Sequence, residues 1–397
     1  MRIGLLEAMA HEVELLCGPR YHPDPDSECK LAGSERGHIY TEQGKEEIRR
    51  PRVRSGDGEE IQLESYRLAS DRNNLFDRVV ESIAAGMPVR GVEKCFDGAV
   101  KKTQASEMWL EKSSDALHQF RERSLVADNW LAIMIDGVFI GNEQCIVIAI
   151  GIQADGSKQV LDFEPGSSES AEVCSLLLER IVERGFSLPE GQRILACLDG
   201  SKALRKAVTR MWSNAVIQEC LIHAERVTHA KLPRKAQEEA RRLFDRMRKA
   251  QGRDHGEEAF DNLIDHIEKH NDSAADHLQD RKASLLAFHR LNVSSELNIT
   301  FLSTNLIENV IRNWRKATHQ VKKWKFGKGN MISRWTAVGL LNAEDGFRKI
   351  RGFEKLDMLA KALRGGDSTD IESAPASSAN AAEPSTPSIS ETNQKKL

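Results

Sequence analysis

The order of predicted strands and helices between residues 130 and 220 constrains the fold of this chain more than any other feature. Apolar, β-branched runs predict strands at 131–136 and 145–152, and an Asp-Gly turn leads into a third strand at 158–163. The pattern then alternates, with a helix at 168–184, a strand at 194–198, a helix from Ser201 to residue 212 and a strand at 216–220. Three sequential strands followed by two that alternate with helices predict an α/β fold.

This order is typical of the ribonuclease-H-like fold, in which the first and fourth strands lie side by side. Asp136 ends the first strand and Asp199 follows the fourth, so we expect their carboxylates to be neighbours. Asp-Gly occurs six times in the chain and usually marks a turn, so it is the position relative to the strands that singles out Asp136 and Asp199. Adjacent carboxylates are unfavourable unless one is protonated or a cation neutralises them, and hard oxygen ligands favour Mg²⁺ or Mn²⁺.

A third carboxylate would complete a site for two metal ions, and Glu308 is the best candidate. It lies in the first turn of a predicted helix, 109 residues after the second aspartate. Asn305 followed by Glu308 also fits a capping box, in which the carboxylate would only bond a backbone N–H, and both interpretations stay open. Asp162 and Glu164, at the end of the third strand, are rival candidates for which we expect solvent exposure at a turn.

Residues 1–70 predict a small β-containing region. A hairpin is expected over 37–55 around Gly44-Lys45, and Pro51 limits any strand there to a sheet edge or a strand start. Four side chains of this region could bind zinc tetrahedrally: Cys17, His22, Cys29 and His38. Their spacing matches no common zinc finger, so packing of small side chains in loops is the favoured interpretation.

Residues 71–125 have a helical period. Helices are predicted over 74–85, 89–96 and 103–120, with breaks at Gly86 and at 97–98. Helix, glycine turn and helix are the outline of a helix-turn-helix, in which Lys101, Lys102 and Gln104 would contact phosphates and bases from the start of the third helix. A plain three-helix bundle is the alternative.

Residues 224–299 are rich in Ala, Glu, Arg, Leu and Lys and predict a helical insertion, so that the catalytic domain would comprise 126–223 and 300–352. Its second part predicts a helix over 305–315, a basic aromatic loop and a final helix or pair of helices over 333–349. The segment 365–397 consists largely of Ser, Ala, Thr, Glu and Pro without an aromatic residue, which predicts a disordered tail.

Basic residues are concentrated near the end of the predicted domain. The formal charge of the whole chain is −3, but residues 308–355 contain 12 Lys and Arg against 4 Asp and Glu, which suggests a polyanionic partner. Arg312 and Arg315 follow Glu308 on one helix face, where they could pair with it, hold a phosphate or simply face solvent.

The basic loop alternates cations with aromatic rings, and this combination suits phosphates and unpaired bases. We expect nucleic-acid contacts from Lys322, Lys323, Trp324, Lys325 and Lys328. In the alternative interpretation, Trp324 and Phe326 are anchors in the hydrophobic core.

Composition excludes several classes of protein. The longest apolar runs are much shorter than the roughly 18 residues of a membrane-spanning helix, and the first residues lack the pattern of a signal peptide. The seven cysteines are scattered and form no CxxC pair, which argues against a disulfide framework. We therefore expect a cytoplasmic protein with reduced thiols.

The chain resembles the mutator-type transposases of bacterial insertion sequences over roughly residues 17–352. Four strings carry the resemblance: Ile135-Asp-Gly-Val138, Leu198-Asp-Gly-Ser-Lys-Ala-Leu204, Cys220-Leu-Ile-His223 with Arg226 following, and Ser303-Thr-Asn-Leu-Ile-Glu308 with Arg312 beyond. The family implies a ribonuclease-H-like catalytic domain with a helical insertion, preceded by a DNA-binding region. Its acidic triad would fall on Asp136, Asp199 and Glu308, and its Cys-x2-His signature on Cys220 and His223, which we expect to pack and support the site.

The resemblance implies phosphoryl transfer at DNA ends, with two Mg²⁺ or Mn²⁺ ions held by the triad, and a homo-oligomer that binds element ends and target DNA. In the cell the protein would associate with the nucleoid. Two alternatives differ in chemistry: an inactive or domesticated DNA-binding relative, and a ribonuclease-H-like nuclease that cuts without joining strands. A glycosidase is a weaker alternative because aromatic residues make up only 6% of the chain.

Overall fold

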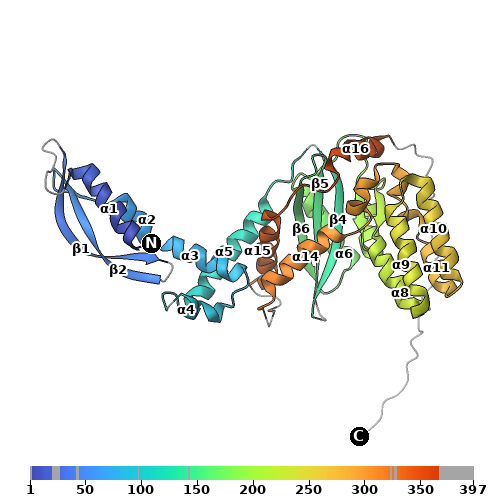
Figure 1. Cartoon of the computed structure of the whole chain (residues 1–397), viewed down its shortest axis with the longest axis horizontal. Coiled ribbons are helices and arrows are strands. Elements are labelled where there is room, and N and C mark those ends of the chain that lie inside the picture. Colours follow the sequence, from blue (N-terminus) through green and yellow to red (C-terminus); the bar gives the residue numbers. More distant parts are fainter. Residues whose placement is uncertain are drawn as a thin grey trace, which may run out of the picture. The chain divides into compact units, whose positions relative to one another are not determined.

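The computed structural model confirms the α/β class, with a five-stranded mixed sheet as the framework of the central segment (Figure 1). The structure describes residues 2–19, 27–41, 44–96, 98–127, 129–141, 144–321, 324–325 and 329–365. The predicted disordered tail lies outside these residues except for Gly365. No helix in the described part of the chain is long and apolar enough to cross a membrane.

The strand order of this sheet is β6-β5-β4-β7-β8. Its strands are β4 (Trp130–Ile140), β5 (Gln144–Gln153), β6 (Lys158–Gly166), β7 (Leu195–Leu198) and β8 (Val216–Glu219). The first three pair antiparallel, whereas β7 is parallel to β4 and β8 is parallel to β7. The connecting helices are α6 (Ala171–Glu183) and α7 (Lys202–Met211). Each strand and helix predicted between residues 130 and 220 is therefore present.

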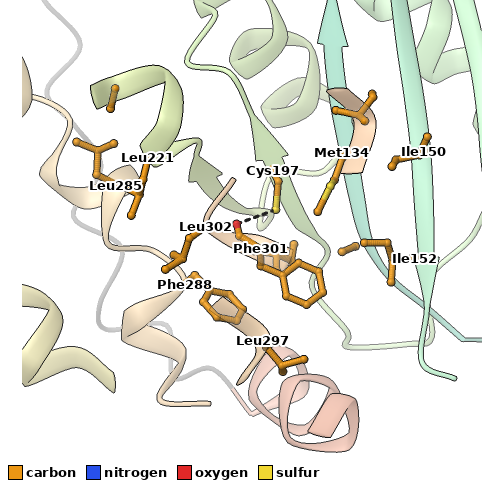
Figure 2. Packing of buried hydrophobic residues seen from close by; sticks show 14 of the residues in the cluster. Met134, Ile150, Ile152, Cys197, Leu221, Leu285, Phe288, Leu297, Phe301 and Leu302 are labelled. Carbon is orange, nitrogen blue, oxygen red and sulfur yellow. Dashed lines mark hydrogen bonds between the residues drawn. The ribbon is translucent and has the colours of Figure 1, made fainter. Parts of the chain in front are cut away.

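Alternation along the strands separates two hydrophobic layers. Ile133 and Ile135 pack in one cluster with residues of α6 and α7. Met134 and Cys197, which are partners in the β4–β7 register, belong to the cluster on the opposite face. Figure 2 shows this second layer, in which the Cys197 thiol lies 3.4 Å from the backbone oxygen of Phe301. Since side chains alternate, Asp136 and Asp199 continue the face of Met134 and Cys197.

Strand β4 extends further than predicted. Its pairing with β7 ends at Ile135↔Leu198, but its pairing with β5 continues to Ile140↔Gln144. Asp136 was expected to end the strand, and instead it lies within it. The physical reason is that β5 still satisfies one edge of β4 after β7 has turned into the next helix.

A series of helices follows β8. They are α8 (Leu221–Lys231), α9 (Arg234–Lys249), α10 (Gly252–Glu268), α11 (Asp272–Gln279), α12 (Lys282–Leu285) and α13 (Asn298–Phe301), with short 3₁₀ turns at His289–Leu291 and Ser295–Leu297. The two ends of this series meet. The Leu221 N–H donates to the Leu302 oxygen at 2.9 Å, and the Thr304 N–H donates to the Cys220 sulfur at 3.3 Å.

The chain then returns to the sheet. Helix α14 (Asn305–Thr318) packs on β4 and β5, and α15 (Met331–Asp345) packs on α14, α5 and β6. A 3₁₀ turn at Phe353–Lys355 and helix α16 (Leu356–Arg364) follow, and the sequence interpretation did not include them. Buried Leu356, Leu359 and Leu363 join α16 to the same core as α14.

The N-terminal elements confirm the predicted hairpin and extend it. They are α1 (Arg2–Cys17), β1 (Cys29–Thr41), β2 (Gly44–Ser55), β3 (Glu60–Ile61) and α2 (Glu64–Ser70). Pro51 was expected at an edge or a strand start, but it lies inside β2, the middle strand of a three-stranded sheet. The position tolerates proline because β3 pairs only with Val53 and Arg54, and the β1 register shifts opposite Pro51.

The predicted helices of 71–125 are present as α3 (Arg72–Ala84), a 3₁₀ turn at Val89–Gly91 continued by α4 (Val92–Cys95), and α5 (Lys102–Glu122). Gly86 separates the first two with a φ of +110°, a left-handed conformation that glycine adopts without strain. Three elements with a shared buried core fit both the helix-turn-helix and the plain bundle.

The expectation that Asp162 and Glu164 face solvent is wrong. Asp162 is fully buried in β6, where its carboxylate pairs with Arg121 at 2.6 Å, Arg180 at 2.9 Å and Arg184 at 3.3 Å. Glu164 pairs with Arg180 at 2.6 Å and is also largely covered. The arginines come from α5 and from the end of α6, so α5 covers a strand end that the local pattern suggested was open.

Candidate functional site

Two carboxylates lie side by side at the point where β4 and β7 separate. Ile135 pairs with Leu198, so Asp136 and Asp199 occupy the next position on adjacent parallel strands, which are about 5 Å apart. Asp136 is only 6% exposed, and one of its oxygens accepts a hydrogen bond from the Gly137 N–H at 2.8 Å. Asp199 is partly exposed, and its Oδ1 accepts from the Ser201 N–H at 2.8 Å.

Glu308 reaches this pair from the first turn of α14. Its Oε1 lies 3.8 Å from His223 Nε2 and 3.4 Å from the Thr304 hydroxyl, which donates to it. Thr304, and not Asn305, is the residue that precedes the helix, so the capping box suggested by the sequence does not form on Asn305. The carboxylate of Glu308 therefore faces the side chains of His223 and Thr304.

A buried hydroxyl connects the two ends of the helical series to this carboxylate. Thr304 is fully buried, and its Oγ1 lies 3.4 Å from Cys220 Sγ and 3.3 Å from His223 Nδ1. The Cys220 sulfur in turn accepts from the His223 N–H at 3.5 Å at the start of α8. His223 thus lies against Glu308, and Cys220 contacts Thr304 and His223 beside it; their supporting role stays a prediction.

The electrostatics reflect the crowding of negative charge. Burial, reinforced by the charge of Asp199, raises the pKa of Asp136 to about 7. The hydrogen bond with Cys220 raises the pKa of His223, and the nearby carboxylates of Asp136 and Glu308 raise it further. Burial alone would raise the pKa of the Cys220 thiol, but its bonds with His223 and Thr304 lower it below the usual value.

The donor atoms fit a metal ion. Asp136, His223 and Glu308 each offer one ligand atom, and these atoms lie within 4.8 Å of one another. Asp199 adds a further carboxylate beside Asp136. Carboxylate oxygens suit Mg²⁺ and Mn²⁺, and a cation would favour the ionised form of Asp136, whose pKa is raised by burial and by the charge of Asp199. We refer to Asp136, Asp199, Glu308 and His223 together as the acidic cluster.

Glu169 is a fourth carboxylate that the sequence interpretation missed. A Cβ atom on Gly137 would lie 2.6 Å from its Oε2, so its side chain reaches the residue next to Asp136. Its Oε1 is buried without a hydrogen-bond partner among the described residues, and burial raises the pKa of the carboxyl group. In the sequence, Glu169 lies directly before Ser170, the N-cap residue of α6, and no motif there indicates a functional role.

The predicted DNA-binding residues fall into separate places. The side-chain oxygen of Gln104 already accepts a hydrogen bond from the Lys101 N–H at 3.0 Å. This bond caps the start of α5. Lys101 and Lys102 are exposed beside it. On α14, Arg312 contacts Asn309 and not Glu308, and Arg315 is exposed.

The basic loop is described only in part. Trp324 stacks on Trp314, with 6.2 Å between ring centroids, and contacts two hydrophobic clusters, as a core anchor would. Lys325 is exposed. Lys322, Lys323, Phe326 and Lys328 lie outside the described residues.

The four-residue zinc site considered for the N-terminal region is not formed. Cys29 begins β1 and His38 lies nine residues along the same strand, which corresponds to about 30 Å. Cys17 is buried at the end of α1, and His22 lies outside the described residues. One tetrahedral ion therefore cannot take ligands from both Cys29 and His38.

The fold and the acidic cluster together define an α/β protein with a carboxylate-rich site suited to divalent metal. The chain belongs to the Mutator family of transposases, whose family model matches residues 4–348. It is 25% identical over 313 residues to the transposase for insertion sequence element IS905 of Lactococcus lactis, covering 76% of this chain and 77% of that protein. It is 24% identical over 318 residues to the transposase for element IS1201 of Lactobacillus helveticus, with coverage of 76% and 84%. A third relative, the transposase for IS256 in transposon Tn4001 of Staphylococcus aureus, is 26% identical over 234 residues, with coverage of 56% and 58%.

Proposed function

We propose that this chain is a DDE transposase that cleaves DNA at the ends of its insertion sequence and joins those ends to a target. The observation that supports this proposal most directly is that three carboxylates converge. They belong to Asp136 of β4, Asp199 at the end of β7 and Glu308 of α14. The strand order β6-β5-β4-β7-β8 supports assignment to the ribonuclease-H-like fold, with the helices from α8 to α13 as its insertion. Membership of the Mutator family supports the same activity.

Asp136, Asp199 and Glu308 would hold two Mg²⁺ or Mn²⁺ ions. When bound, such ions activate a water or a DNA 3′-hydroxyl for in-line attack and stabilise the leaving oxygen. The raised pKa of His223 favours its charged form beside Glu308 and Asp136, where that charge would offset part of their repulsion. Thr304 orients His223 and Glu308 by contacting both.

The partner in this proposal is DNA, both at the element ends and at the target. Exposed Lys101, Lys102, Arg312, Arg315 and Lys325 supply cations that suit the phosphate backbone. Two ends must be brought together, so we propose a homo-oligomer on DNA and association with the nucleoid.

The proposal is tested with purified protein, Mg²⁺ and duplexes that carry the ends of the surrounding element. We expect cleaved ends and joined products, and neither when EDTA replaces Mg²⁺. Cleavage without joining would support a nuclease instead. DNA binding without any cleavage by the wild-type chain, in Mg²⁺ or Mn²⁺, would support an inactive DNA-binding relative.

Metal binding to the acidic cluster should depend on pH. The pKa of Asp136 is raised to about 7, so protonated Asp136 stabilises the metal-free fold below about pH 4, and this contribution is lost as the pH rises through 7. Below pH 7 a proton competes with the cation, by up to about tenfold in apparent affinity per pH unit. We expect Mg²⁺ to raise the melting temperature more at pH 8 than at pH 6. Equal shifts at both pH values, or an unchanged pH dependence in Asp136→Asn, would contradict this.

Replacement of Thr304 by valine keeps the shape of the side chain but removes the hydroxyl. We expect strand cleavage to fall about 10- to 100-fold, because residues that orient metal ligands typically have effects of this size. Thr304→Ser retains the hydroxyl and should recover most of the activity. If the valine variant cleaves as fast as the serine variant, the hydroxyl does not orient the cluster.

A further inference from the structure

An open cavity of about 410 Å³ lies between α8 and α9, outside the acidic cluster. Its lining is mostly charged and consists of Ile222, Glu225, Arg226, His229, Arg241, Asp245 and Arg248. The three arginines exceed the two carboxylates, and burial lowers the pKa of His229, which favours its neutral ring. The lining therefore has a net positive charge.

The two carboxylates are already occupied by one arginine. Arg248 pairs with Glu225 at 2.6 Å and with Asp245 at 2.5 Å, and Arg248 is largely covered. The Nε2 of His229 lies 3.8 Å from Glu225, which is too far for a hydrogen bond. The inner part of the cavity is thus an ion-pair network that joins α8 to α9.

Two arginines remain available to a ligand. Arg226 is exposed and has no ion pair among the described residues. Arg241 is 64% exposed, and its contact to Glu225 is long, at 3.8 Å. The buried Nε2 of His229 has no hydrogen-bond partner in the described part of the chain, so a donor or acceptor atom in the cavity is unused. Two guanidinium groups beside an unused polar atom suit an oxyanion.

Helix α8 connects this cavity to the acidic cluster. His223 contacts Glu308 from the first turn of α8, and Arg226 follows three residues later on the same helix face. The rise between them is about 4.5 Å, and that from His223 to His229 is about 9 Å. One DNA strand advances about 3.4 Å per nucleotide along its axis, so the cavity lies within about three nucleotides of the cluster.

We propose that this cavity binds a backbone phosphate of the DNA strand that enters the acidic cluster, through Arg226 and Arg241. The inference rests on the proposed transposase function and adds a phosphate site on the insertion. This phosphate would then be held by a residue of α8, the helix that also carries His223 of the acidic cluster. The contact holds the strand in register for the reaction and is independent of base sequence.

The test compares Arg226→Gln/Arg241→Gln with Arg242→Gln, using full-length protein. Arg242 is the neighbouring α9 arginine, but it pairs with Glu238 and Glu239 and does not line the cavity. The probe is a 30-base-pair duplex, and affinity is measured over a range of salt concentrations. We expect the double variant to bind about tenfold more weakly, with a salt slope smaller by about 0.9 for one lost phosphate contact. Arg242→Gln should match wild type.

A second probe locates the phosphate. Duplexes in which one phosphate at a time is replaced by neutral methylphosphonate should bind wild type less well at one position near the cleavage site, and the double variant should be insensitive there. Unchanged affinity and salt slope in the double variant would overturn the phosphate site, as would equal losses in Arg242→Gln. Failure of the wild type to bind the duplex would instead count against the proposed function itself.

Discussion

Asp136→Asn is expected to abolish strand cleavage and joining, with a loss of at least about 10³-fold, while DNA binding persists. The side chain keeps its size and its bond from the Gly137 N–H, but it loses the charge that would hold a metal ion between β4 and α14. Glu308→Gln should have a comparable effect from the other side of the cluster. Cleavage and binding are measured separately, with product analysis on gels and with equilibrium binding to the same duplex.

Asp155→Asn is the matched control. Asp155 also precedes a glycine, but it lies in the turn between β5 and β6, where it accepts a bond from the Ser157 N–H and pairs with Lys349 at 3.4 Å. We expect activity close to wild type in this variant. Cleavage by Asp136→Asn at the rate of Asp155→Asn would show that the cluster is not the reaction centre.

The largest expected effect on stability comes from Asp162→Asn. Asp162 is fully buried and its carboxylate pairs with three arginines, so the neutral amide removes the charge that they share and leaves only Glu164 to pair with Arg121 and Arg180. Removing one partner of a buried ion pair typically costs about 3–5 kcal/mol of unfolding free energy. The measurement is urea unfolding followed by circular dichroism, with the midpoint expected at a much lower urea concentration.

Asp261→Asn is the control for this change, because Asp261 pairs with Lys282 at 2.6 Å but is 59% exposed. An exposed pair contributes about 0–1 kcal/mol, so its midpoint should hardly move. If both variants unfold at the same urea concentration, the Asp162 network does not stabilise the fold, and its arginines find other partners.

The sheet was predictable because its strands are long, apolar and bounded by turns. The same logic placed Asp136 beside Asp199, since the two positions follow paired residues on neighbouring parallel strands. The periodicity of the sequence did not determine the role of Glu308, because a capping box explained a glutamate at this position equally well. The resemblance to transposases favoured a functional role, and the structure shows Glu308 in contact with Thr304 and His223 without a capping box on Asn305, so that its catalytic role stays a prediction.

Other features depend on contacts between distant elements, and no local pattern reports them. Asp162 was predicted to be exposed because nothing in β6 indicates that Arg121 of α5, 41 residues earlier, covers it. Glu169 reaches Gly137 only through the packing of α6 on the sheet. The end of β4 was misplaced because the pairing of β5 beyond Asp136 is a property of the whole sheet.

The hydrogen bonds that join Leu221 to Leu302 and Thr304 to Cys220 make the helical series a closed loop on the sheet. Its entry and exit are joined beside His223 and Glu308, so the positions of these side chains do not depend on how far the intervening helices extend. Helices could be lengthened, removed or exchanged beyond this junction with little disturbance of the carboxylates. The junction thus allows the surface of the helical series to diversify between related chains while the acidic cluster keeps its geometry.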